Sequence, residues 1–294
     1  MFELNLIGDE EADDMTAGIY GDIRETLRIP WTPTIFQALA SYPNYLSLAW
    51  RTIKPAVGTD EFRSDGFGIR EAAEVDVQAK HKPLRTLADT AAVGLDDDDL
   101  DHIRDAIHVF KYGNPKLAII ANALYRSFQG ATVGSGDRSN PAELTNEERY
   151  IREVPLEIIE ENEAGEDVRG IYDDIKTALD MPIVNTDYKA LAQWPGFLEL
   201  AWHDLKEAMK EEWYEMVVDG VWKLSSQLAN DLTVPITLDR NSVMAAGVSE
   251  DDLDALENVI DLFASGLPGL IVNISHFSNT IDDIIESDMG YRAA

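Results

Sequence analysis

"GIYGDIRETLRIPWTPTIFQALASYPNYLSLAWRTIK" occupies residues 18–54, and "GIYDDIKTALDMPIVNTDYKALAQWPGFLELAWHDLK" occupies residues 170–206. The two stretches align without gaps at an offset of 152 residues, and 17 of their 37 positions are identical. A second pair of segments, 95–120 and 248–273, aligns at an offset of 153. Self-similarity at a fixed spacing is the signature of a duplicated structural unit. The chain is therefore predicted to contain two homologous copies of one unit.

The periodicity within each copy is helical. In the first copy Ile19, Ile23 and Leu27 recur at every fourth position, and the second copy repeats this pattern 152 residues later. Apolar residues at this spacing line one face of an α-helix. Residues 35–54 read as two helices broken at Pro43, and alternating strand patterns with turn dipeptides are nearly absent. We therefore expect an all-α fold.

Two glycine-proline segments, "YGNP" at 112–115 and "SGLP" at 265–268, are expected to end apolar helices. Glycine suits the end of a helix, and proline blocks its continuation. The expected architecture is two tandem homologous helical repeats, packed as a pseudo-dimer about a local two-fold axis. The expected limits are residues 1–126 for repeat one, 127–168 for a polar linker and 169–294 for repeat two.

The charge of the chain is strongly negative. Fifty-five acidic and 24 basic side chains give a net charge of −31, and the acidic residues are spread over the whole chain. Such a surface repels phosphates, so neither nucleic acid nor an anionic membrane is expected as a partner. Lysine is scarce, with 10 residues in 294. This combination indicates adaptation to concentrated salt, as in a halophile, because salt screens the repulsion between like charges.

The residue types that are missing exclude several kinds of chemistry. The chain contains no cysteine, so disulfides, thiolate nucleophiles and cysteine-based metal sites are excluded. Its five histidines show no metal-ligand spacing such as H-E-x-x-H. No metal and no cofactor are therefore expected. We also expect no membrane span and no secretory signal, and hence a cytoplasmic protein.

The two copies differ where one has a polar residue and the other a hydrocarbon. Asp187 aligns with Ile35, and Asn114 aligns with Leu267. If the two-fold axis brings these positions together, Asp187 from the second copy faces Asn114 from the first copy in one apolar cavity. That arrangement gives one active site per chain. Two further mismatched pairs are Asn185 with Pro33 and Trp31 with Ile183.

A structural role for the same residues stays open. Thr34 and Thr186 are good N-cap residues, which would place Asp187 in the first turn of a helix. An exposed carboxylate at that position stabilises the helix dipole without any catalytic role. Asn114 is likewise suited to a turn.

Two motifs carry a resemblance to a known family. "VNTDYKALAQWP" at 184–195 and "YGNPK" at 112–116, set in a duplicated all-α chain, resemble the DehI family, the group I D,L-2-haloacid dehalogenases. The resemblance covers roughly residues 16 to 280. It implies hydrolysis of short 2-halocarboxylic acids to 2-hydroxy acids and halide. In that family an aspartate activates a water that attacks the α-carbon directly, with inversion of configuration and no ester intermediate.

The resemblance also implies roles for individual residues. Asp187 is the expected base, and Asn114 is its water-holding partner. Thr186 stands where the family often has serine. The expected substrate contacts are Thr186, Trp31, Ile35, Phe36 and Tyr188. The expected partners are a 2-halocarboxylate and water, and a homodimer is one expected assembly.

Two alternative functions stay open at this point. In one, Asp187 is itself the nucleophile and forms an aspartyl ester with the substrate. In the other, the chain is a non-catalytic helical scaffold or small-acid binding protein that keeps the fold.

The charge generates a testable prediction. Because −31 charges repel one another in dilute salt, the melting temperature should rise as KCl is increased from about 0.1 M to about 3 M. Differential scanning calorimetry measures this directly. A melting temperature that is flat or falls over that range would contradict salt adaptation.

Overall fold

The computed structural model describes residues 4–82, 85–135 and 140–292, and within these ranges the fold is all-α, as predicted. The described residues form no strand, only two isolated β-bridges, Thr59–Pro141 and Val133–Ile236. The helices, in chain order, are α1 (Asp14–Leu27), α2 (Thr34–Leu39), α3 (Pro43–Val57), α4 (Asp60–Gln78), α5 (Leu87–Ala92), α6 (Asp97–Phe128), α7 (Asn146–Glu153), α8 (Glu166–Leu179), α9 (Thr186–Leu191), α10 (Pro195–Ala208), α11 (Glu212–Asn230), α12 (Arg240–Ala245), the 3₁₀ turn η1 (Glu250–Asp252) and α13 (Leu253–Arg292).

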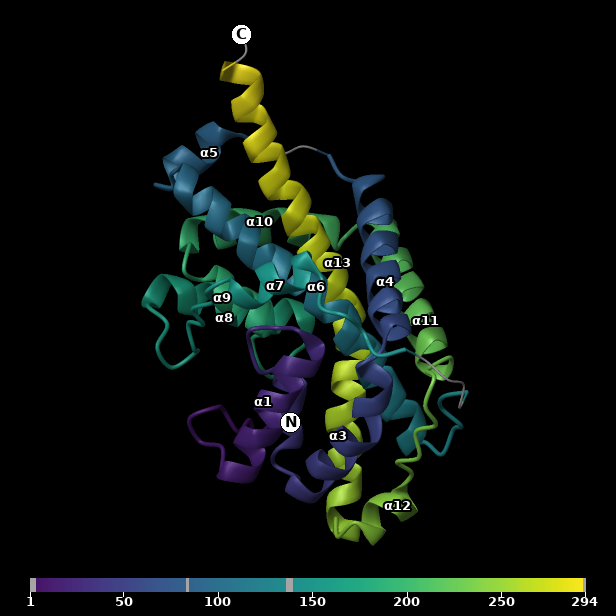
Figure 1. Cartoon of the computed structure of the whole chain (residues 1–294). Helices are drawn as coiled ribbons and strands as arrows, with labels where there is room; N and C mark the ends of the chain where they lie inside the picture. Colours follow the sequence, from purple (N-terminus) through teal and green to yellow (C-terminus); the bar gives the residue numbers. More distant parts are fainter. Residues whose placement is uncertain (1–3, 83–84, 136–139, 293–294) are drawn as a thin grey trace.

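Four helices form the centre of the molecule. Each of α4, α6, α11 and α13 contacts the other three, and the contact between α6 and α13 is the most extensive. Figure 1 shows α13 running the length of the molecule with α4 and α11 beside it. The shorter helices pack around this bundle. Their apolar faces and those of the bundle form one continuous hydrophobic core.

Helix lengths recur between the two halves of the chain. Helices α1 and α8 have 14 residues each, α2 and α9 have six each, and α4 and α11 have 19 each. Helices α3 and α10 have 15 and 14 residues. Both α3 and α10 begin with a proline, the residue at which the sequence predicts the break from the preceding helix.

Individual contacts recur at the offset of the sequence repeat. The indole N–H of Trp50 donates to Asp22 at 2.7 Å, and that of Trp202 donates to Asp174 at the same distance. The residues after α1 and α8 are the only non-glycine residues with positive φ in the described chain. Another recurring bond joins a tyrosine hydroxyl to a backbone carbonyl at 2.8 Å, Tyr20 to Ile7 and Tyr172 to Ile159. These recurrences support two copies of one unit, and the two-fold axis between them stays a prediction.

The two long helices do not end where the sequence predicts. Helix α6 continues through Pro115, and α13 continues through Pro268. A proline inside a helix removes one hydrogen bond and costs about 3 kcal/mol. Here both helices are buried against the rest of the bundle on either side of the proline, and this packing outweighs the local cost. Asn114 therefore lies inside a central helix and not in a turn.

The region expected to be a polar linker contains ordered structure. Helix α7 lies within it and begins with a capping box between Thr145 and Glu148. Ile151 of α7 is fully buried, and Glu148 is 2% exposed. Helix α6 reaches two residues into this region, and α8 begins before its end. The limits of the two repeats and the linker stay predictions.

One helix of the described residues, Glu250–Ser287, is long and apolar enough to cross a membrane by length and composition. This finding differs from the expectation, based on the sequence, that no stretch is apolar enough to span a membrane. However, 56% of its most apolar part is buried inside the molecule, against α6, α4 and α11. A position in the centre of the bundle accounts for this composition.

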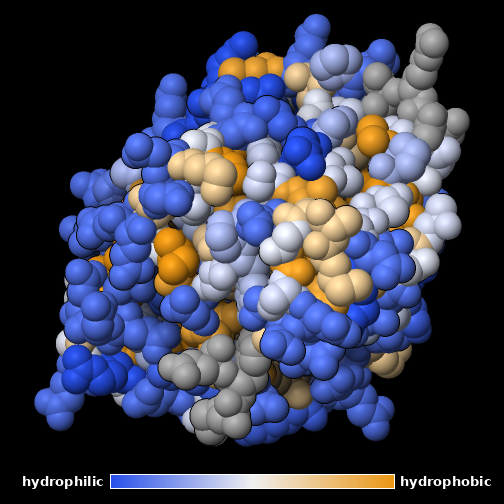
Figure 2. Space-filling view, turned by 90° about the horizontal axis from the view of Figure 1, so that it is seen from below, coloured by the Kyte–Doolittle hydropathy of each residue, from blue (hydrophilic) through white to orange (hydrophobic). Residues whose placement is uncertain are grey.

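The surface of the molecule differs from this apolar centre. Hydrophilic side chains cover most of the face shown in Figure 2, with small apolar areas between them.

Candidate active site

The two halves of the chain cross over at the site. Helix α2 of the first half packs on α13 of the second, and α9 of the second half packs on α6 of the first. Each short helix therefore starts beside the long helix of the other half. This crossing brings residues 35 and 187 into contact with the opposite long helices.

Asp187 and Asn114 lie together, as the asymmetry between the copies predicts. The side-chain amide of Asn114 donates a 2.6 Å hydrogen bond to Oδ1 of Asp187, although the two residues are 73 positions apart. Asp187 is 3% exposed and Asn114 is 1% exposed. The purely structural role for Asp187 requires an exposed carboxylate at the start of a helix. The Asp187 carboxylate is buried, so it does not fit that role.

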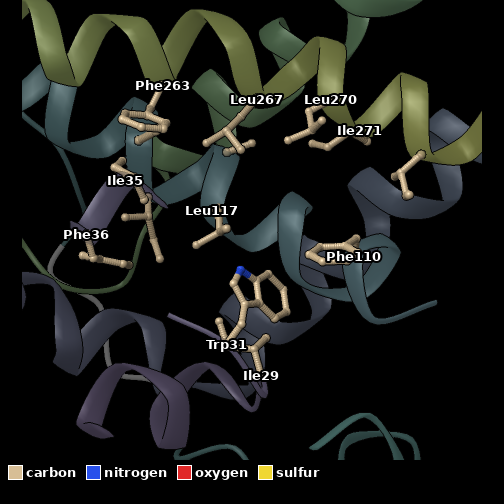
Figure 3. Packing of buried hydrophobic residues seen from close by; sticks show 14 of the residues in the cluster. Ile29, Trp31, Ile35, Phe36, Phe110, Leu117, Phe263, Leu267, Leu270 and Ile271 are labelled. Carbon is tan, nitrogen blue, oxygen red and sulfur yellow. The ribbon is translucent and has the colours of Figure 1, made fainter. Parts of the chain in front are cut away.

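The corresponding apolar pair lies in the same cavity. Ile35 on α2 and Leu267 on α13 line the cavity together with Asp187 and Asn114. Figure 3 shows Trp31, Ile35 and Leu117 facing the α13 side chains. The remaining wall residues are Trp31, Thr34, Leu117, Asn185, Thr186, Phe263 and Leu270. The site is thus a mainly apolar chamber with one carboxylate in its wall.

The cavity is small. The space open to the centres of water-sized spheres is about 20 Å³. A single water needs at least about 10–15 Å³ on this measure and several polar partners. The cavity therefore has room for about one water next to the carboxylate.

Thr34 and Thr186 join the two halves at the cavity. Their hydroxyl oxygens lie 2.8 Å apart, at hydrogen-bond distance. The sequence predicts both threonines to be N-caps, but the N-caps are Pro33 and Asn185, and neither makes a capping side-chain bond. Each threonine is the first residue of its helix. Its hydroxyl group hydrogen-bonds to the hydroxyl of the other threonine and does not cap its own helix.

Trp31 lines the cavity and packs closely against α6. Its ring packs on Phe110, with the ring centroids 4.9 Å apart, and lies directly over Gly113. A Cβ atom at Gly113 would overlap the Trp31 ring. In the second copy Ile183 replaces the tryptophan, and the nearest atom to a Cβ at Gly266 would be 3.8 Å away. Gly113 therefore makes room for the Trp31 ring, and it does not end a helix.

Two of the expected substrate contacts lie elsewhere. Phe36 and Tyr188 are fully buried and do not line the cavity. Each packs edge-on against the tryptophan of its own copy, with ring centroids 5.8 Å apart, Phe36 on Trp50 and Tyr188 on Trp202. They directly follow Ile35 and Asp187, but the helical turn directs them away from the cavity and into the core.

Several wall residues were not anticipated from the sequence, namely Thr34, Leu117, Asn185, Phe263 and Leu270. Asn185 is informative because its Oδ1 atom is buried without a hydrogen-bond partner. Its mismatch with Pro33 is the kind of asymmetry that singled out Asp187. The apolar wall residues carry no such signal.

Burial changes the acidity of Asp187. Its apolar surroundings raise its pKa to about 7, while the bonds from the Asn114 amide and from its own backbone N–H favour the ionised form. The carboxylate is therefore about half ionised near neutral pH. Such a pKa suits a group that accepts a proton near neutral pH. Among the described residues, no group of three or more histidine, aspartate or glutamate side chains is arranged to hold a metal ion.

The contact between Trp31 and Gly113 generates a matched prediction. Gly113→Ala should lower the free energy of unfolding by about 1–3 kcal/mol, because the added methyl displaces the ring. Gly266→Ala, at the equivalent position, should be neutral or stabilising by up to about 1 kcal/mol, since alanine favours helix and has room there. Urea unfolding of both variants measures the difference. Equal effects would show that the ring does not depend on Gly113.

The chain has relatives of known activity. It is 30% identical over 279 residues to an (R)-2-haloacid dehalogenase of Pseudomonas putida, a match that covers 92% of this chain and 90% of the relative. It is 26% identical over 270 residues to a configuration-inverting 2-haloacid dehalogenase of Alcaligenes xylosoxydans xylosoxydans, covering 90% and 88%.

The comparisons with solved structures and with a family model also match this chain to haloacid dehalogenases. The fold is similar to that of a D-2-haloacid dehalogenase mutant in complex with D-2-CPA, with a TM-score of 0.86 and 28% identity over 95% of this chain and 96% of that chain. A D-2-haloacid dehalogenase with L-LA matches over the same shares, with a TM-score of 0.86 and 29% identity. The family model described as halocarboxylic acid dehydrogenase DehI matches residues 30–187 and 182–283. The chain therefore belongs to the DehI family.

Proposed function

We propose that this protein hydrolyses short 2-halocarboxylic acids to 2-hydroxy acids and halide. The observation that carries the proposal is the buried bond between Asp187 and Asn114, in an apolar cavity with room for about one water. A positioned carboxylate with a pKa near neutrality is a suitable general base. The relatives named as 2-haloacid dehalogenases give the substrate class.

The reaction needs one water and one base. We place the attacking water in the cavity, against the Asp187 carboxylate. Asn114 orients that carboxylate through its bond to Oδ1. As the water oxygen forms its bond to the α-carbon, a water proton passes to Asp187 and the carbon–halogen bond breaks. The halide leaves with the bonding electron pair, and Asp187 later releases the proton to solvent.

This route accounts for the stereochemistry of the relatives. Attack on carbon from the side opposite the halogen inverts the configuration in a single displacement. A relative described as configuration-inverting fits that outcome. An ester intermediate cleaved at its carbonyl also involves one displacement at the α-carbon, so inversion alone does not separate the two mechanisms.

Polar groups for the substrate carboxylate lie on the same wall. Thr34, Thr186 and Asn185 all line the cavity, and the threonine hydroxyls and the Asn185 amide N–H groups can donate hydrogen bonds to a carboxylate. A haloacid has several more non-hydrogen atoms than water, so the wall must move to admit it. Separation of the Thr34 and Thr186 hydroxyls would open the cavity and free both hydroxyls for the carboxylate.

Single-turnover hydrolysis in ¹⁸O-labelled water separates the two catalytic mechanisms. With direct attack, the label appears in the 2-hydroxy acid during the first turnover. With an aspartyl ester, the first product carries an unlabelled oxygen from Asp187, and the label enters the carboxylate. Mass spectrometry of the product and of the peptide containing Asp187 gives the answer. Halide release from racemic 2-chloropropionate, at low and molar salt, tests the non-catalytic alternative.

Asp187→Asn should reduce halide release by roughly two to four orders of magnitude, which is the usual contribution of a positioned base. The asparagine carbonyl still accepts the bond from Asn114, so the geometry of the wall is kept. The measurement is the steady-state rate with 2-chloropropionate. Near-normal turnover in this variant would contradict the proposed role of Asp187.

The same substitution should make the protein more stable above neutral pH. The folded-state pKa of about 7 lies above the ordinary value of 3.8, so the native state holds the proton more tightly than the unfolded chain does. The stability of the wild type is therefore expected to fall as pH rises from about 4 to about 7. At pH 8 the free energy of unfolding of Asp187→Asn should exceed that of the wild type by roughly 2–4 kcal/mol. Below about pH 4 this difference should vanish. Urea unfolding at both pH values is the measurement, and it also controls for misfolding.

The pH dependence of kcat/KM should report the same group. Since the base acts only when ionised, kcat/KM should fall tenfold per pH unit below a pKa of about 7. Halide release measured from about pH 5 to about pH 9 gives this profile. A profile that stays flat down to pH 5 would show that the catalytic base has an ordinary carboxylate pKa.

A further inference from the structure

A second, larger cavity lies against the same helix as Asn114. About 220 Å³ of it is open to the centres of water-sized spheres, against about 20 Å³ beside Asp187. Tyr112 and Lys116 of α6 line this cavity. They are four residues apart and so share one face of the helix, whereas Asn114 lies on the opposite face. The two cavities are therefore separated by α6.

Basic side chains are concentrated in this second cavity. The chain has 24 basic residues among 294, and four of them, Arg63, Arg70, Lys111 and Lys116, line this cavity. Among the residues that the structure describes, two carboxylates line it, those of Glu147 and Glu148. Clustering of one sign of charge in a cleft focuses the field and concentrates ions of the opposite sign. Arg70 is paired with Glu147 at 2.7 Å and Lys111 with Glu74 at 3.1 Å, so Arg63 and Lys116 are the cations of this cavity that can attract a small anion.

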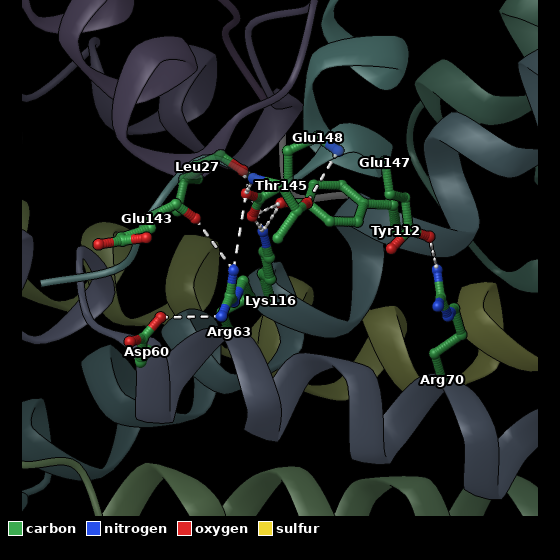
Figure 4. A network of polar contacts seen from close by, with 10 residues as sticks. All are labelled: Leu27, Asp60, Arg63, Arg70, Tyr112, Lys116, Glu143, Thr145, Glu147 and Glu148. Atoms are coloured by element: carbon green, nitrogen blue, oxygen red, sulfur yellow. Dashed lines mark hydrogen bonds and ion pairs between the residues drawn. The ribbon is translucent and has the colours of Figure 1, made fainter. Parts of the chain in front are cut away.

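Lys116 is the deepest of these cations. It is 4% exposed, and its stem packs over Gly66, where a Cβ atom would come within 3.0 Å. Its ammonium group donates to the carbonyl of Leu27 at 3.1 Å and to the hydroxyl of Tyr112. Figure 4 shows these contacts converging on the ammonium group. A larger residue at position 66 of α4 would have to displace the lysine stem, so Lys116 is packed in place and is not a flexible surface lysine.

Glu148, the carboxylate within ion-pair range of both Lys116 and Arg63, hydrogen-bonds to neither of them. Glu148 lies 3.9 Å from Lys116 and 3.9 Å from Arg63. Its short bonds are accepted instead from the Tyr112 hydroxyl at 2.6 Å and the Thr145 backbone N–H at 2.8 Å. Arg63 is paired with Asp60 at 2.8 Å and donates to the carbonyl of Glu143 at 3.0 Å. These bonds leave other N–H groups of the Arg63 guanidinium, and one N–H of the Lys116 ammonium, available as donors. A further anion oxygen can complete their coordination.

The acidity of Lys116 agrees with this geometry. Burial lowers its pKa to about 7, the Glu148 and Glu147 carboxylates act against that change, and Arg63 and Arg28 add to it. An anion bound beside the amine favours the charged form. Binding should therefore draw a proton onto Lys116 near pH 7.5.

We propose that this cavity binds a small monocarboxylate, with Lys116 and Arg63 as its charged partners. Phe67 and Tyr112 border the cavity and provide surface for a short apolar chain. Glu147 and Glu148 disfavour more highly charged anions such as phosphate. Both the substrate and the product of the proposed reaction carry the required group. The site is nevertheless distinct from Asp187, and its occupancy does not depend on turnover.

Crystals of the wild type soaked with 3-bromopropionate test the proposal. This probe is a monocarboxylate but not a 2-haloacid, and its bromine is located by anomalous scattering. A bromine peak in the cavity of Lys116, lost in Lys116→Met and in Arg63→Gln, is the expected result. Lys54→Met, which removes a charge paired with Asp22 outside this cavity, is the matched control and should keep the peak. A peak at Asp187 would be seen separately, so the two sites are distinguishable.

Calorimetric titration of isobutyrate at pH 7.5 gives the solution counterpart. The heat of binding should depend on the ionisation enthalpy of the buffer, because Lys116 takes up a proton, and this dependence should disappear in Lys116→Met. Arg63→Gln should weaken the binding of isobutyrate, and the proton uptake linked to it, by about tenfold. If Lys116→Met does not fold, Arg63→Gln alone tests the proposal. Absence of bromine from the cavity, a peak that persists in both variants, or a buffer-independent heat in the wild type would overturn the proposal.

Discussion

The crossed packing of the short helices is the constraint on which the site depends. Because α9 lies on α6 and α2 lies on α13, residues from opposite halves of the chain share one cavity. Neither half contains the pair of Asp187 and Asn114 by itself. The hydrogen bond between Thr34 and Thr186 joins the two crossings at their common point. Loss of the register between the halves would therefore separate the base from its partner before it disrupted either half.

The same crossing makes a buried carboxylate tolerable. An aspartate at 3% exposure carries an energetic cost that shows in its raised pKa. The opposite pair, Ile35 with Leu267, is apolar and packs without such a cost. The pair of Asp187 and Asn114 thus provides the catalytic groups, and the pair of Ile35 and Leu267 provides apolar packing. This division is the usual compromise between a strained functional group and the core that supports it.

Comparison of the copies predicted the fold class, the break between α2 and α3, and the meeting of Asp187 with Asn114. These features follow from patterns that the duplication makes visible. The passage of α6 through Pro115 was missed, because a local rule about proline competes with packing that only the folded bundle provides. Phe36 and Tyr188 were misplaced because adjacency in sequence does not give the direction of a side chain on a helix. The cavity at Lys116 was missed because its residues come from α4, α6 and α7 and form no motif.

A single cavity shared by both crossings also limits how many sites such a molecule can have. A symmetric homodimer of the second half alone would place two aspartates at the wall of a space with room for about one water. Like charges that close cannot both ionise, so one carboxyl would have kept its proton and lost its use as a base. In this chain the two halves differ in sequence, so Ile35 lines the cavity where a second aspartate would otherwise lie. One base per chain is, on this view, an electrostatic requirement of a small cavity that two halves share.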